Sequence, residues 1–494
     1  MEALGDRGLK AIGLGCRYDK SWVFKDLNFS VKPGEALGII GPSGSGKTTL
    51  AYCITGIIPK NLKGEVAGSV YVDGNNILEL DDKERYKIVN VVLQNYEIQI
   101  FGLTVEEDLL FVLENLELDE EETEKRLEWA LERFGLKEYR NYQVNELSGG
   151  LRQRLALAST LLMRPKYLVM DDPMANLDWR GIVELRQTLR MLKDSGHGLV
   201  IMARRLKGLD SVIDKTITLG YEPAQQNMLD DVLGESRPTF IEDDPVIKFE
   251  NVWFKYARRM VLKNVNLTIN RGQCVVLMGP NGSGKTTLAK HINGLLKPSS
   301  GRVLVLGKDT KIHGPAQIAK HVGFVFQDPD KHITQESVWE EAIFGAKNLG
   351  LSCSYAETVL EVLKLNHRKN DPPYCLSMGE RIRLSIAGVL AMNPEVLIFD
   401  EPTTGQDEET LSIINSLLKK MKTEGKTILV ITHDSDFALK IGDRIIVIYD
   451  GSVVADGQPR RILFDNGLLE KFGLEPPSNV LVQPVKEVFD YAKA

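Results

Sequence analysis

The chain contains 494 residues, and at roughly 150 residues per domain this length predicts about three folding units. Apolar residues make up 43% and charged residues 26%, which is ordinary globular usage and argues against a disordered, collagen-like or disulfide-stapled chain. The formal net charge of −7 gives no electrostatic reason to expect binding to nucleic acid or to an acidic bilayer surface.

Cysteine usage and hydropathy indicate the compartment. No apolar run approaches the roughly 18 residues of a membrane-spanning helix, and the first residues lack the apolar stretch of a signal peptide. We therefore expect a cytosolic protein, or one that reaches a membrane only through partners. The five cysteines are odd in number and too scattered for a paired metal site, so they favour a reducing compartment and are expected to fill apolar space: Cys16, Cys53, Cys274, Cys353 and Cys375.

An internal repeat organises the chain. GPSGSGKTTL at 41–50 returns as GPNGSGKTTL at 279–288, an offset of 238 residues. The polar, proline-containing stretch 220–244 suits a linker, so we expect a first domain at 1–219 and a second at 245–494. Two later pairs of segments recur with an offset of 229 residues: NELSGGLRQRLALAS (145–159) with PYCLSMGERIRLSIAG (373–388), and YLVMDDPMANLD (167–178) with VLIFDEPTTGQD (396–407).

The predicted elements follow the same order in each half. A short apolar strand, EALGIIG or CVVLMG, leads into a glycine-rich turn and then a helix that begins near Lys47 or Lys285. The charged stretch 119–138 has the pattern of an amphipathic helix with a solvated face. The later strands, YLVMD and LVIMA in the first half and VLIFD and ILVIT in the second, are rich in β-branched residues. Such strands are typical of a mostly parallel sheet buried on both faces.

The glycine-rich turns carry the first chemistry. Both match GxxxxGK[ST], in which backbone amides point at nucleotide phosphates and the helix N-terminus adds a favourable dipole. Lysine in this motif reaches the β- and γ-phosphates, and the Thr hydroxyl binds Mg²⁺. A plain glycine turn before a helix explains one such match but rarely two in register. The expected nucleotide-binding residues are Gly41, Ser43, Gly44, Gly46, Lys47, Thr48 and Thr49, and Gly279, Asn281, Gly282, Gly284, Lys285, Thr286 and Thr287.

Two aspartates end the apolar strands that should lie beside these loops. Asp171 closes YLVMD and Asp400 closes VLIFD. A carboxylate at this place is within reach of the metal through water. A lone aspartate at a strand end is usually a turn former, but the repeat places both aspartates at the same point in the order of motifs. We therefore expect Asp171 and Asp400 to be metal ligands, together with Thr48 and Thr286.

Taken together, the two halves resemble the ATP-binding cassettes of the ABC transporter superfamily. Each half has an aromatic residue 23 positions before the phosphate loop, a glutamine after the next strand, a signature segment and an aspartate after the Asp-ended strand. In the first half these are Tyr18, Gln94, Leu147 to Gly150, and Asp178; in the second they are Tyr256, Gln327, Leu376 to Gly379, and Asp407.

The resemblance implies a role for each of these motifs. Tyr18 and Tyr256 would stack on adenine, although either could instead be a core residue. Gln94 and Gln327 would contact Mg²⁺ and communicate with a membrane subunit. The amides and hydroxyls of the signatures precede a helix and so suit an anion. The signature residues that the family uses to contact the γ-phosphate from the opposing cassette are Ser148, Gly149, Gly150, Ser377 and Gly379.

The resemblance also implies the fold and the ligands. The implied fold class is α/β, with two tandem P-loop ATP-binding cassettes, each made of a mostly parallel sheet core, an antiparallel β subdomain and a helical signature subdomain. The implied cofactors are ATP and Mg²⁺. In this family two cassettes pair head to tail, here within one chain, so that each ATP lies between one phosphate loop and the opposite signature.

The two halves differ at the positions that the family uses for hydrolysis. Glu401 stands where the family places the carboxylate that polarises water, and His433 where it places the γ-phosphate switch histidine. The first half has Asp172 and Arg204 instead. Aspartate is shorter by about 1.5 Å, and misplacement by about 1 Å can cost about 10²-fold in rate. Arginine cannot act as a neutral acceptor. The expected catalytic residues are Glu401, His433, Gln327 and Lys285.

Under head-to-tail pairing, every one of these departures falls in the same composite site. The first loop would face the second signature, LSMGE, in which Met378 replaces a glycine and obstructs close approach of backbone to phosphate. We hypothesise that this site binds ATP, hydrolyses it slowly if at all, and mainly holds the halves together. The second loop would face LSGG of the first half and form the complete site.

The segments after the glutamines are similar to those of energy-coupling-factor transporter ATPases: LQNYEIQIFGLTVEEDLLF (93–111) and FQDPDKHITQESVWEEAIFG (326–345). The tail KFGLEPPSNVL resembles the same group. This resemblance implies an ATPase at the cytoplasmic face of the membrane that powers uptake of a vitamin or transition-metal ion. The implied partners are a transmembrane coupling subunit and a small substrate-binding membrane protein, with contact segments at 94–101 and 327–334.

Two other functions stay open on the sequence. One is the ATPase of a sugar ABC importer, which is similar in length but does not match in the segments after the glutamines. The other is a soluble double-cassette ABC protein that acts on ribosomes or nucleic acid. Such proteins usually have a long charged linker or basic insertions, whereas this linker is short and acidic. We therefore expect no nucleic-acid partner.

Overall fold

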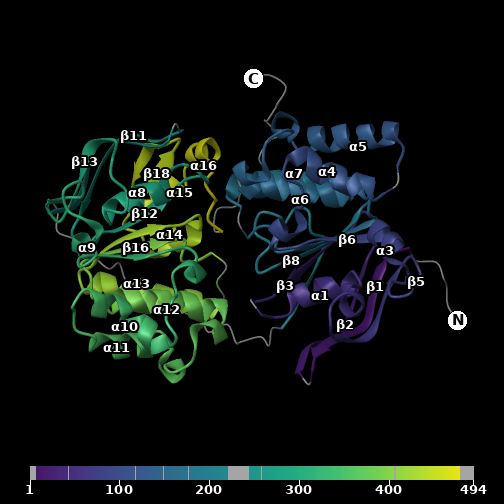
Figure 1. Ribbon diagram of the computed structural model, residues 1–494, viewed down its shortest axis with the longest axis horizontal. Coiled ribbons are helices and arrows are strands. Elements are labelled where there is room, and N and C mark those ends of the chain that lie inside the picture. Colours follow the sequence, from purple (N-terminus) through teal and green to yellow (C-terminus); the bar gives the residue numbers. More distant parts are fainter. Residues whose placement is uncertain are drawn as a thin grey trace. The chain divides into compact units, whose positions relative to one another are not determined.

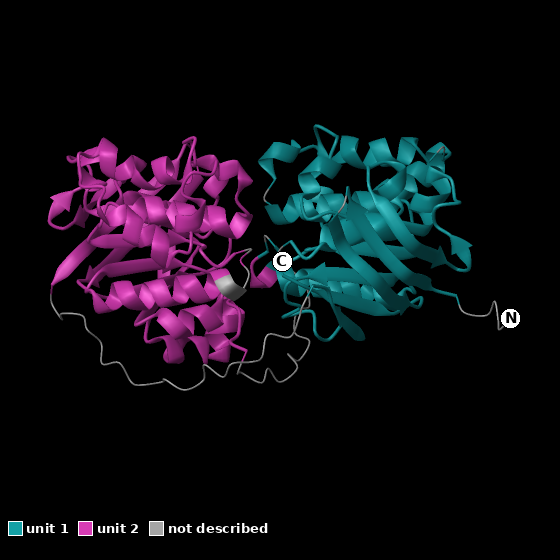
Figure 2. Cartoon of the chain, turned by 90° about the horizontal axis from the view of Figure 1, so that it is seen from below, with its two compact units in different colours: residues 1–177, 181–228 teal, residues 178–180, 229–494 magenta. Residues whose placement is uncertain are grey.

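The computed structural model describes residues 7–220 and 244–478, apart from positions 20, 43, 117, 148, 176, 258, 405 and 407 and the side chains of 408 and 409. Two compact units are formed by 1–177 with 181–228, and by 178–180 with 229–494 (Figure 2). Residues 178–180 therefore belong to the second unit by their contacts. The predicted linker, 220–244, lies outside the described residues except at its two ends, so its boundaries stay a prediction.

The first unit contains a parallel sheet with strand order β6-β7-β8-β3-β9 and an antiparallel sheet with order β2-β1-β4-β5. The parallel strands are β3 Ala36–Ile40, β6 Val89–Val92, β7 Tyr167–Asp171, β8 Gly198–Ala203 and β9 Lys215–Thr218. The antiparallel strands are β1 Leu9–Tyr18, β2 Ser21–Val31, β4 Glu65–Val72 and β5 Asn75–Asn76.

Helices α4, α5, α6 and α7 cover one face of this parallel sheet, and α1 and the antiparallel sheet lie on the other face (Figure 1). The predicted charged helix is present as α5, and its N-cap Asp119 accepts a hydrogen bond from the amide of Glu122. The helices are α1 Lys47–Ile54, α2 Ile57–Lys60, α3 Asp82–Ile88, α4 Val105–Glu114, α5 Glu120–Arg133, α6 Gly149–Leu162 and α7 Trp179–Asp194, with 3-10 turns at Tyr96–Gln99, Lys137–Tyr139 and Val144–Glu146.

The second unit repeats this plan. Its larger sheet has the order β15-β16-β17-β12-β18-β19 and is parallel except for the edge strand β19; the second sheet has the order β11-β10-β13-β14. The larger sheet is built from β12 Cys274–Met278, β15 Val322–Val325, β16 Val396–Asp400, β17 Thr427–Ile431, β18 Arg444–Tyr449 and β19 Ser452–Gly457. The antiparallel sheet is built from β10 Pro245–Tyr256, β11 Arg259–Asn270, β13 Ser300–Val305 and β14 Lys308–Asp309.

The apolar runs of the parallel strands are buried because each strand packs on both faces. In β12, Cys274 and Val276 join the core under the helices, whereas Val275 and Leu277 join the core under the antiparallel sheet. The helices are α8 Lys285–Ile292, α9 Pro315–Ile318, α10 Val338–Asn348, α11 Tyr355–Val362, α12 Met378–Leu390, α13 Glu408–Thr423, α14 Ser435–Ile441, α15 Pro459–Leu463 and α16 Asn466–Phe472, with 3-10 turns at Pro329–Lys331, Asn366–Arg368 and Pro373–Cys375.

The structure bears on two features considered from composition, hydropathy and the cysteines. In the portion of the chain that the structure describes, no helix is both long and apolar enough to cross a bilayer. Cys16, Cys53 and Cys274 are buried fillers, as predicted. The prediction is wrong for Cys375, which is exposed because it lies in a 3-10 turn on the surface rather than in a sheet or packed helix.

Candidate functional site

The second phosphate loop connects β12 to α8 and requires glycine at its two ends. Gly279 has φ 138°, and a Cβ there would lie 2.0 Å from the carbonyl oxygen of Ile448. Gly284 has φ 107° and is the N-cap of α8, which begins at Lys285 as predicted. These are conformations that only glycine adopts without strain. The loop therefore exposes backbone amides at the start of a helix, where an anion is favoured.

The first phosphate loop has the same build. Gly44 and Gly46 have φ 77° and 93°, and Gly46 is the N-cap of α1. A Cβ on Gly41 would approach the carbonyl oxygen of Leu219 to 2.6 Å. Thr49 and Thr287 lie in the first turns of α1 and α8, behind their loops, and Gly282 has φ 76°.

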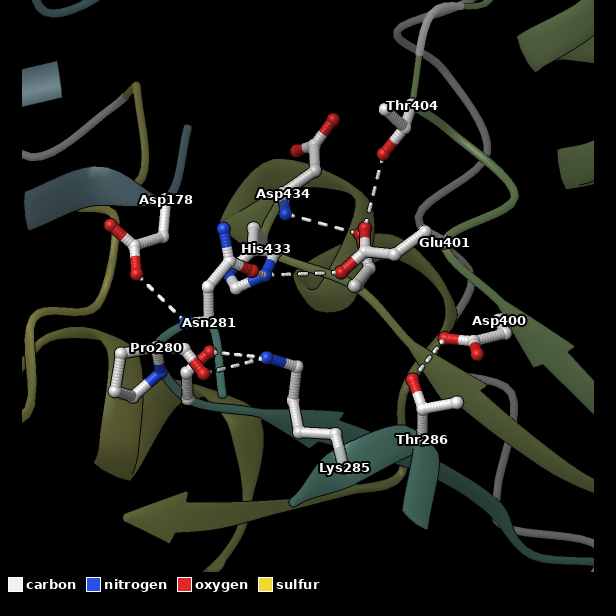
Figure 3. Close-up of polar contacts among 12 residues, drawn as sticks. Asp178, Pro280, Asn281, Lys285, Thr286, Asp400, Glu401, Thr404, His433 and Asp434 are labelled. Carbon is white, nitrogen blue, oxygen red and sulfur yellow. Dashed lines mark hydrogen bonds and ion pairs between the residues drawn. The ribbon is translucent and has the colours of Figure 1, made fainter. Parts of the chain in front are cut away.

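The lysine of each loop curls back onto its own backbone. Lys285 Nζ donates hydrogen bonds to the carbonyl oxygens of Gly279 at 2.7 Å and Pro280 at 3.0 Å (Figure 3). Lys47 Nζ does the same at 2.7 Å to Gly41 and 2.7 Å to Pro42. Burial lowers the pKa of both lysines, while the neighbouring carboxylates oppose that effect. Each ammonium group is thus held against the backbone of its own phosphate loop.

Two serines in the loops were not among the predicted residues. The hydroxyls of Ser45 and Ser283 are buried, and neither has a hydrogen-bond partner within the described ranges. Buried hydroxyls normally find a partner, so these two are available to a ligand oxygen in the loop. Both positions are variable letters in the GxxxxGK[ST] pattern, which is why the pattern did not select them.

A threonine and an aspartate meet at the base of each loop. Thr286 Oγ1 lies 3.2 Å from Asp400 Oδ1 (Figure 3), and Thr48 Oγ1 lies 2.5 Å from Asp171 Oδ2. Burial raises the pKa of both carboxyls, Asp171 and Asp400, and the threonine hydrogen bonds oppose this rise. A hydroxyl and a carboxylate beside a phosphate loop are hard oxygen donors, which fit Mg²⁺ bound together with a nucleotide.

Glu401 and His433 face each other above the second loop. His433 Nε2 lies 3.2 Å from Glu401 Oε1, and Thr404 Oγ1 donates to Glu401 Oε2 at 3.2 Å (Figure 3). Burial raises the pKa of Glu401 to about 7, although the charge of Lys285 acts in the opposite direction. Burial and the charge of Lys285 lower the pKa of His433 to about 3, so this imidazole is neutral at pH 7. The contact is therefore not an ion pair, and Glu401 Oε1 has no hydrogen-bond partner within the described residues.

Asn281 joins this pair to the loop backbone. Its Oδ1 lies 3.1 Å from His433 Nε2, and its amide nitrogen donates to Asp178 Oδ2 at 2.8 Å (Figure 3). Both oxygens that face His433 Nε2 are acceptors, which favours the tautomer with the proton on Nε2. Asp178 belongs to the second unit, so the carboxylate, the amide, the imidazole and Glu401 form one connected set.

The first loop has a different set of neighbours. Asp172 follows β7 as Glu401 follows β16, and both residues have a left-handed backbone, with φ 47° and 51°. Burial raises the pKa of the Asp172 carboxyl, and the positive charges of Arg204 and Lys47 oppose that rise. The predicted substitution of arginine for the histidine therefore places a permanent cation near this carboxylate.

The aromatic residues and the glutamines lie at exposed strand ends. Tyr18 ends β1 with 40% of its side chain exposed and Tyr256 ends β10 with 46%, which argues against the core alternative. Gln94 and Gln327 follow β6 and β15 and are exposed. Neither glutamine takes part in the polar contacts described above. Their predicted contacts with Mg²⁺ and with a membrane subunit therefore stay predictions.

The two signature helices begin differently. Ser377 caps α12 in a reciprocal arrangement: its Oγ accepts from the Glu380 amide at 3.3 Å, and Glu380 Oε2 accepts from the Ser377 amide at 2.8 Å. Leu151 stands at the position of Glu380 in the first half, so α6 has no such carboxylate. Gly149 and Gly150 open α6, and Gly379 is buried in α12. Ser43, Ser148 and Asp407 lie outside the described residues.

Met378 replaces a glycine in the second signature. We predicted that its side chain would obstruct the approach of a phosphate. The side chain is half-buried and packs against the hydrophobic core that contains Leu376 and Ile382. Part of its bulk is therefore taken up by packing, and the obstruction of a phosphate stays a prediction.

Comparisons with known proteins cover both halves. A family model described as ABC transporter matches residues 24–175 and 262–404. A protein of Methanosarcina acetivorans, provisionally named an ABC transporter ATP-binding protein, is 31% identical, and the match covers 95% of this chain and 88% of the relative. A relative from Methanosarcina mazei with the same provisional name is 32% identical, with 94% of this chain and 90% of the relative covered.

One solved structure with higher identity matches about half of the chain. It is cbiO1 from Clostridium perfringens, described as part of the ABC transporter complex cbiONQ. It is 37% identical, and the match covers 46% of this chain and 94% of that chain with a TM-score of 0.42.

Proposed function

Because the chain belongs to the ABC transporter family, whose ATP-binding cassettes are ATPases coupled to transport, we propose that it powers an importer of the energy-coupling-factor type. It would act at the cytoplasmic face of a membrane, bound to a transmembrane coupling subunit and a small substrate-binding membrane protein. Its cargo would be a vitamin or a transition-metal ion. The similarity of 93–111 and 326–345 to the corresponding segments of that group supports this choice.

The observation that carries the ATPase proposal is the connected set above the second loop. Lys285 lies against the loop carbonyls, with Glu401 and His433 3.2 Å apart beside it. Lys285 would leave the carbonyl oxygens and bind the β- and γ-phosphates, since a charged phosphate oxygen is the stronger acceptor. The glycine amides and the Ser283 hydroxyl would bind the remaining phosphate oxygens.

Glu401 and His433 would act on the attacking water and the γ-phosphate. With a pKa of about 7, Glu401 can accept a hydrogen bond from water in its ionised form and orient the oxygen toward phosphorus. A neutral His433 can donate from Nε2 to a γ-phosphate oxygen. Mg²⁺, held by Thr286 and Asp400 with the nucleotide, would supply positive charge to the phosphate oxygens. Gln327, which was predicted to contact Mg²⁺, would complete this set.

The first loop would bind ATP but hydrolyse it slowly. Asp172 replaces the longer glutamate, and Arg204 replaces the histidine with a cation that cannot accept a proton. In the family each nucleotide lies between one phosphate loop and the signature of the other cassette, and we propose the same pairing within this chain. The first loop would then serve mainly to hold the two cassettes together.

A surface on the first unit supports a membrane partner. Phe101 and Leu103 are 69% and 79% exposed, and Ile98 and Phe111 lie in the same stretch with 57% and 47% exposed. The rings of Phe101 and Phe111 are 5.5 Å apart between centroids. Large exposed apolar side chains gathered in one place mark interaction sites. We propose that the transmembrane coupling subunit contacts this surface.

The proposal is tested by exchanging one carboxylate in each half. Glu401→Gln should lower steady-state phosphate release by about 100-fold or more, because the water loses its acceptor. Asp172→Asn, the matched change in the first half, should leave phosphate release within about twofold of the unaltered protein. Full activity in Glu401→Gln, together with loss in Asp172→Asn, would reverse the assignment of the two halves.

The transport step requires a separate experiment. Purification from native membranes should yield a complex with hydrophobic small subunits, and reconstituted vesicles should accumulate cargo when ATP is supplied on the side of this protein. Sedimentation with ribosomes would instead support the soluble double-cassette alternative, and a co-purifying sugar permease would support the sugar importer. ATP-driven extrusion from the vesicles would contradict import.

A further inference from the structure

Residues 178–180 are held in the second unit at both ends of their short segment. At one end, Asp178 Oδ2 accepts a hydrogen bond of 2.8 Å from the amide of Asn281 in the phosphate loop. At the other end, Arg180 reaches residues close to the C-terminal end of the described chain. The segment therefore has one attachment to the proposed ATP site and one attachment far from it in sequence.

The second attachment uses most of the guanidinium group of Arg180. Its Nη2 donates to the carbonyl oxygen of Lys471 at 2.8 Å, and its Nη1 donates to the hydroxyl of Tyr449 at 3.3 Å. The guanidinium carbon also lies 5.1 Å from the centroid of the Tyr449 ring. Two hydrogen bonds and a cation–π contact fix both the position and the orientation of a planar group, which a lysine could not reproduce.

The end of α16 provides the space for this arginine. Gly473 follows the helix with φ 63°, and a Cβ on it would lie 2.4 Å from Arg180 Nε and 2.5 Å from Arg180 Cγ. The carbonyl oxygen of Lys471, in the last turn of the same helix, is an orphan acceptor of the kind that helix ends leave. The glycine and the open helix end together make a seat for Arg180.

The first attachment leads directly to the hydrolysis residues. Asn281 is bound through its amide to Asp178 and through its Oδ1 to His433 Nε2, at 3.1 Å. His433 Nε2 in turn lies 3.2 Å from Glu401 Oε1 (Figure 3). A shift of Asp178 by 1 Å would therefore be passed to the imidazole through a single intervening residue.

We propose that Arg180 is a positioning residue for ATP hydrolysis, seated on Tyr449, Lys471 and Gly473 so that Asp178 holds Asn281 and His433 in register. This inference rests on the proposed function of the second loop as the hydrolytic site. It assigns a role in hydrolysis to the end of α16, which contains none of the nucleotide motifs. Arg180 itself contacts neither the loop nor Glu401.

The first test separates positioning from substrate binding. Arg180→Ala should lower kcat for ATP hydrolysis by about 10-fold or more and leave KM within about twofold, because the phosphate loop is intact but His433 is displaced. Arg180→Lys keeps one donor for the Lys471 carbonyl and should give an intermediate kcat. The double variant of Asp178→Ala and Arg180→Ala should be no slower than the slower single variant, since both changes break the same chain of contacts.

The second test leaves every polar group in place. Gly473→Ala should displace Arg180 and lower kcat to the level of Arg180→Ala. Gly350→Ala is the matched control, because Gly350 has φ 66° and a Cβ there would meet nothing within 4 Å. Both variants share the strain of alanine in a left-handed conformation, so only Gly473→Ala should change kcat. Thermal midpoints of all variants show whether they fold.

The outcomes distinguish this inference from the proposed function. If Glu401→Gln abolishes hydrolysis but folded Arg180→Ala and Gly473→Ala keep the original kcat, only the positioning role is overturned. Multiplicative losses in the double variant would overturn it as well, because they would show independent effects. If Glu401→Gln hydrolyses ATP at the original rate, the proposed function is overturned, and the positioning role of Arg180 is overturned as well.

Discussion

At the scale of single residues, Glu401 directly follows β16 and carries a carboxylate that is buried beside a second carboxylate, Asp400. The raised pKa of Glu401 could not be predicted from the sequence, because the same Asp-Glu pair on a surface would be ionised at pH 7. The structure shows that Glu401 is buried and that its neighbour His433, at 3.2 Å, is neutral. Burial therefore raises the pKa of Glu401 by more than the charge of Lys285 lowers it.

The raised pKa of Glu401 predicts how the free energy of unfolding depends on pH. The pKa of Glu401 is raised from 4.5 to about 7 on folding, so the folded state holds its proton more tightly than the unfolded state. The contribution of Glu401 to the free energy of unfolding is therefore full below pH 4.5, is lost as the pH rises to about 7, and is flat above that. The loss is of the order of 3 kcal/mol.

The variant Glu401→Gln lacks this titration. Without nucleotide or Mg²⁺, its urea midpoint should fall less between pH 5 and pH 8 than that of the unaltered protein. Glu424→Gln, which changes an exposed glutamate in the same unit, should show the original fall. Equal pH responses in all three proteins would show that Glu401 is not buried as described.

The sequence predicts which polar side chains gather at each phosphate loop where the motif fixes their spacing, while their roles toward nucleotide and metal stay predictions. Lys47 and Lys285 lie in their loops, and Asp171 and Asp400 meet Thr48 and Thr286, because each of these residues sits at a fixed step from a strand end or a helix start. Ser45 and Ser283 were missed because nothing in their sequence context separates a buried hydroxyl from an exposed one.

At the scale of elements, a buried carboxylate pins the segment after each glutamine. Asp108, in α4, accepts hydrogen bonds from the amides of Phe101 at 2.8 Å and Gly102 at 3.1 Å, and from the Ser159 hydroxyl at 2.7 Å. In the second unit, Glu341 accepts from two amides in the same manner, at 2.9 and 3.0 Å. The aromatic surface proposed to meet the membrane subunit is thus held by its own helix.

Removing this anchor should destabilise the first unit. Asp108→Ala leaves two amides and a hydroxyl without their acceptor, and the expected loss in the free energy of unfolding is about 2–5 kcal/mol. Glu114→Ala, at the exposed end of the same helix, should cost less than about 0.5 kcal/mol. Urea unfolding measures both, and faster amide hydrogen exchange at Phe101 and Gly102 should accompany only the first change.

The sequence pattern predicted α6, the helix after the first signature, but neither α4 nor the carboxylate that anchors its start. Residues 106–108 are three consecutive acids at a helix start, and each looks like a solvated first-turn carboxylate. Only the packing of α4 against α6 shows that Asp108 alone turns inward to Ser159. The contact between Asp108 and Ser159 joins residues 51 positions apart, so it leaves no periodic pattern in the sequence.

At the scale of the whole molecule, the repeat gives two cassettes of the same plan with different surfaces. Where the first unit exposes Phe101 and Leu103, the matched positions of the second are Thr334 and Glu336. A membrane partner would therefore meet an apolar surface on one cassette and a polar one on the other. The order of motifs predicted the shared plan, whereas this difference emerges only when exposure is known.

The surface difference can be tested without altering the nucleotide sites. The double change Phe101→Ala and Leu103→Ser removes two side chains that are mostly exposed, so basal ATPase activity and thermal stability should stay within experimental error. Recovery of the membrane subunits in a pull-down should fall by about 10-fold or more, because anchors of this size dominate binding free energy. The matched change of Thr334→Ala and Glu336→Ser should have a smaller effect, and an equal loss from both pairs would contradict the asymmetry.

The left-handed backbone at Glu401 and Asp172, with φ 51° and 47°, has a consequence for the natural history of such a chain. Any side chain other than glycine is strained there by roughly 1–2 kcal/mol. At Glu401, a single codon change to glycine would relieve that strain and at the same time remove the carboxylate proposed to orient the attacking water. Laboratory evolution that selects for thermal stability alone would therefore favour stable variants that hydrolyse ATP slowly.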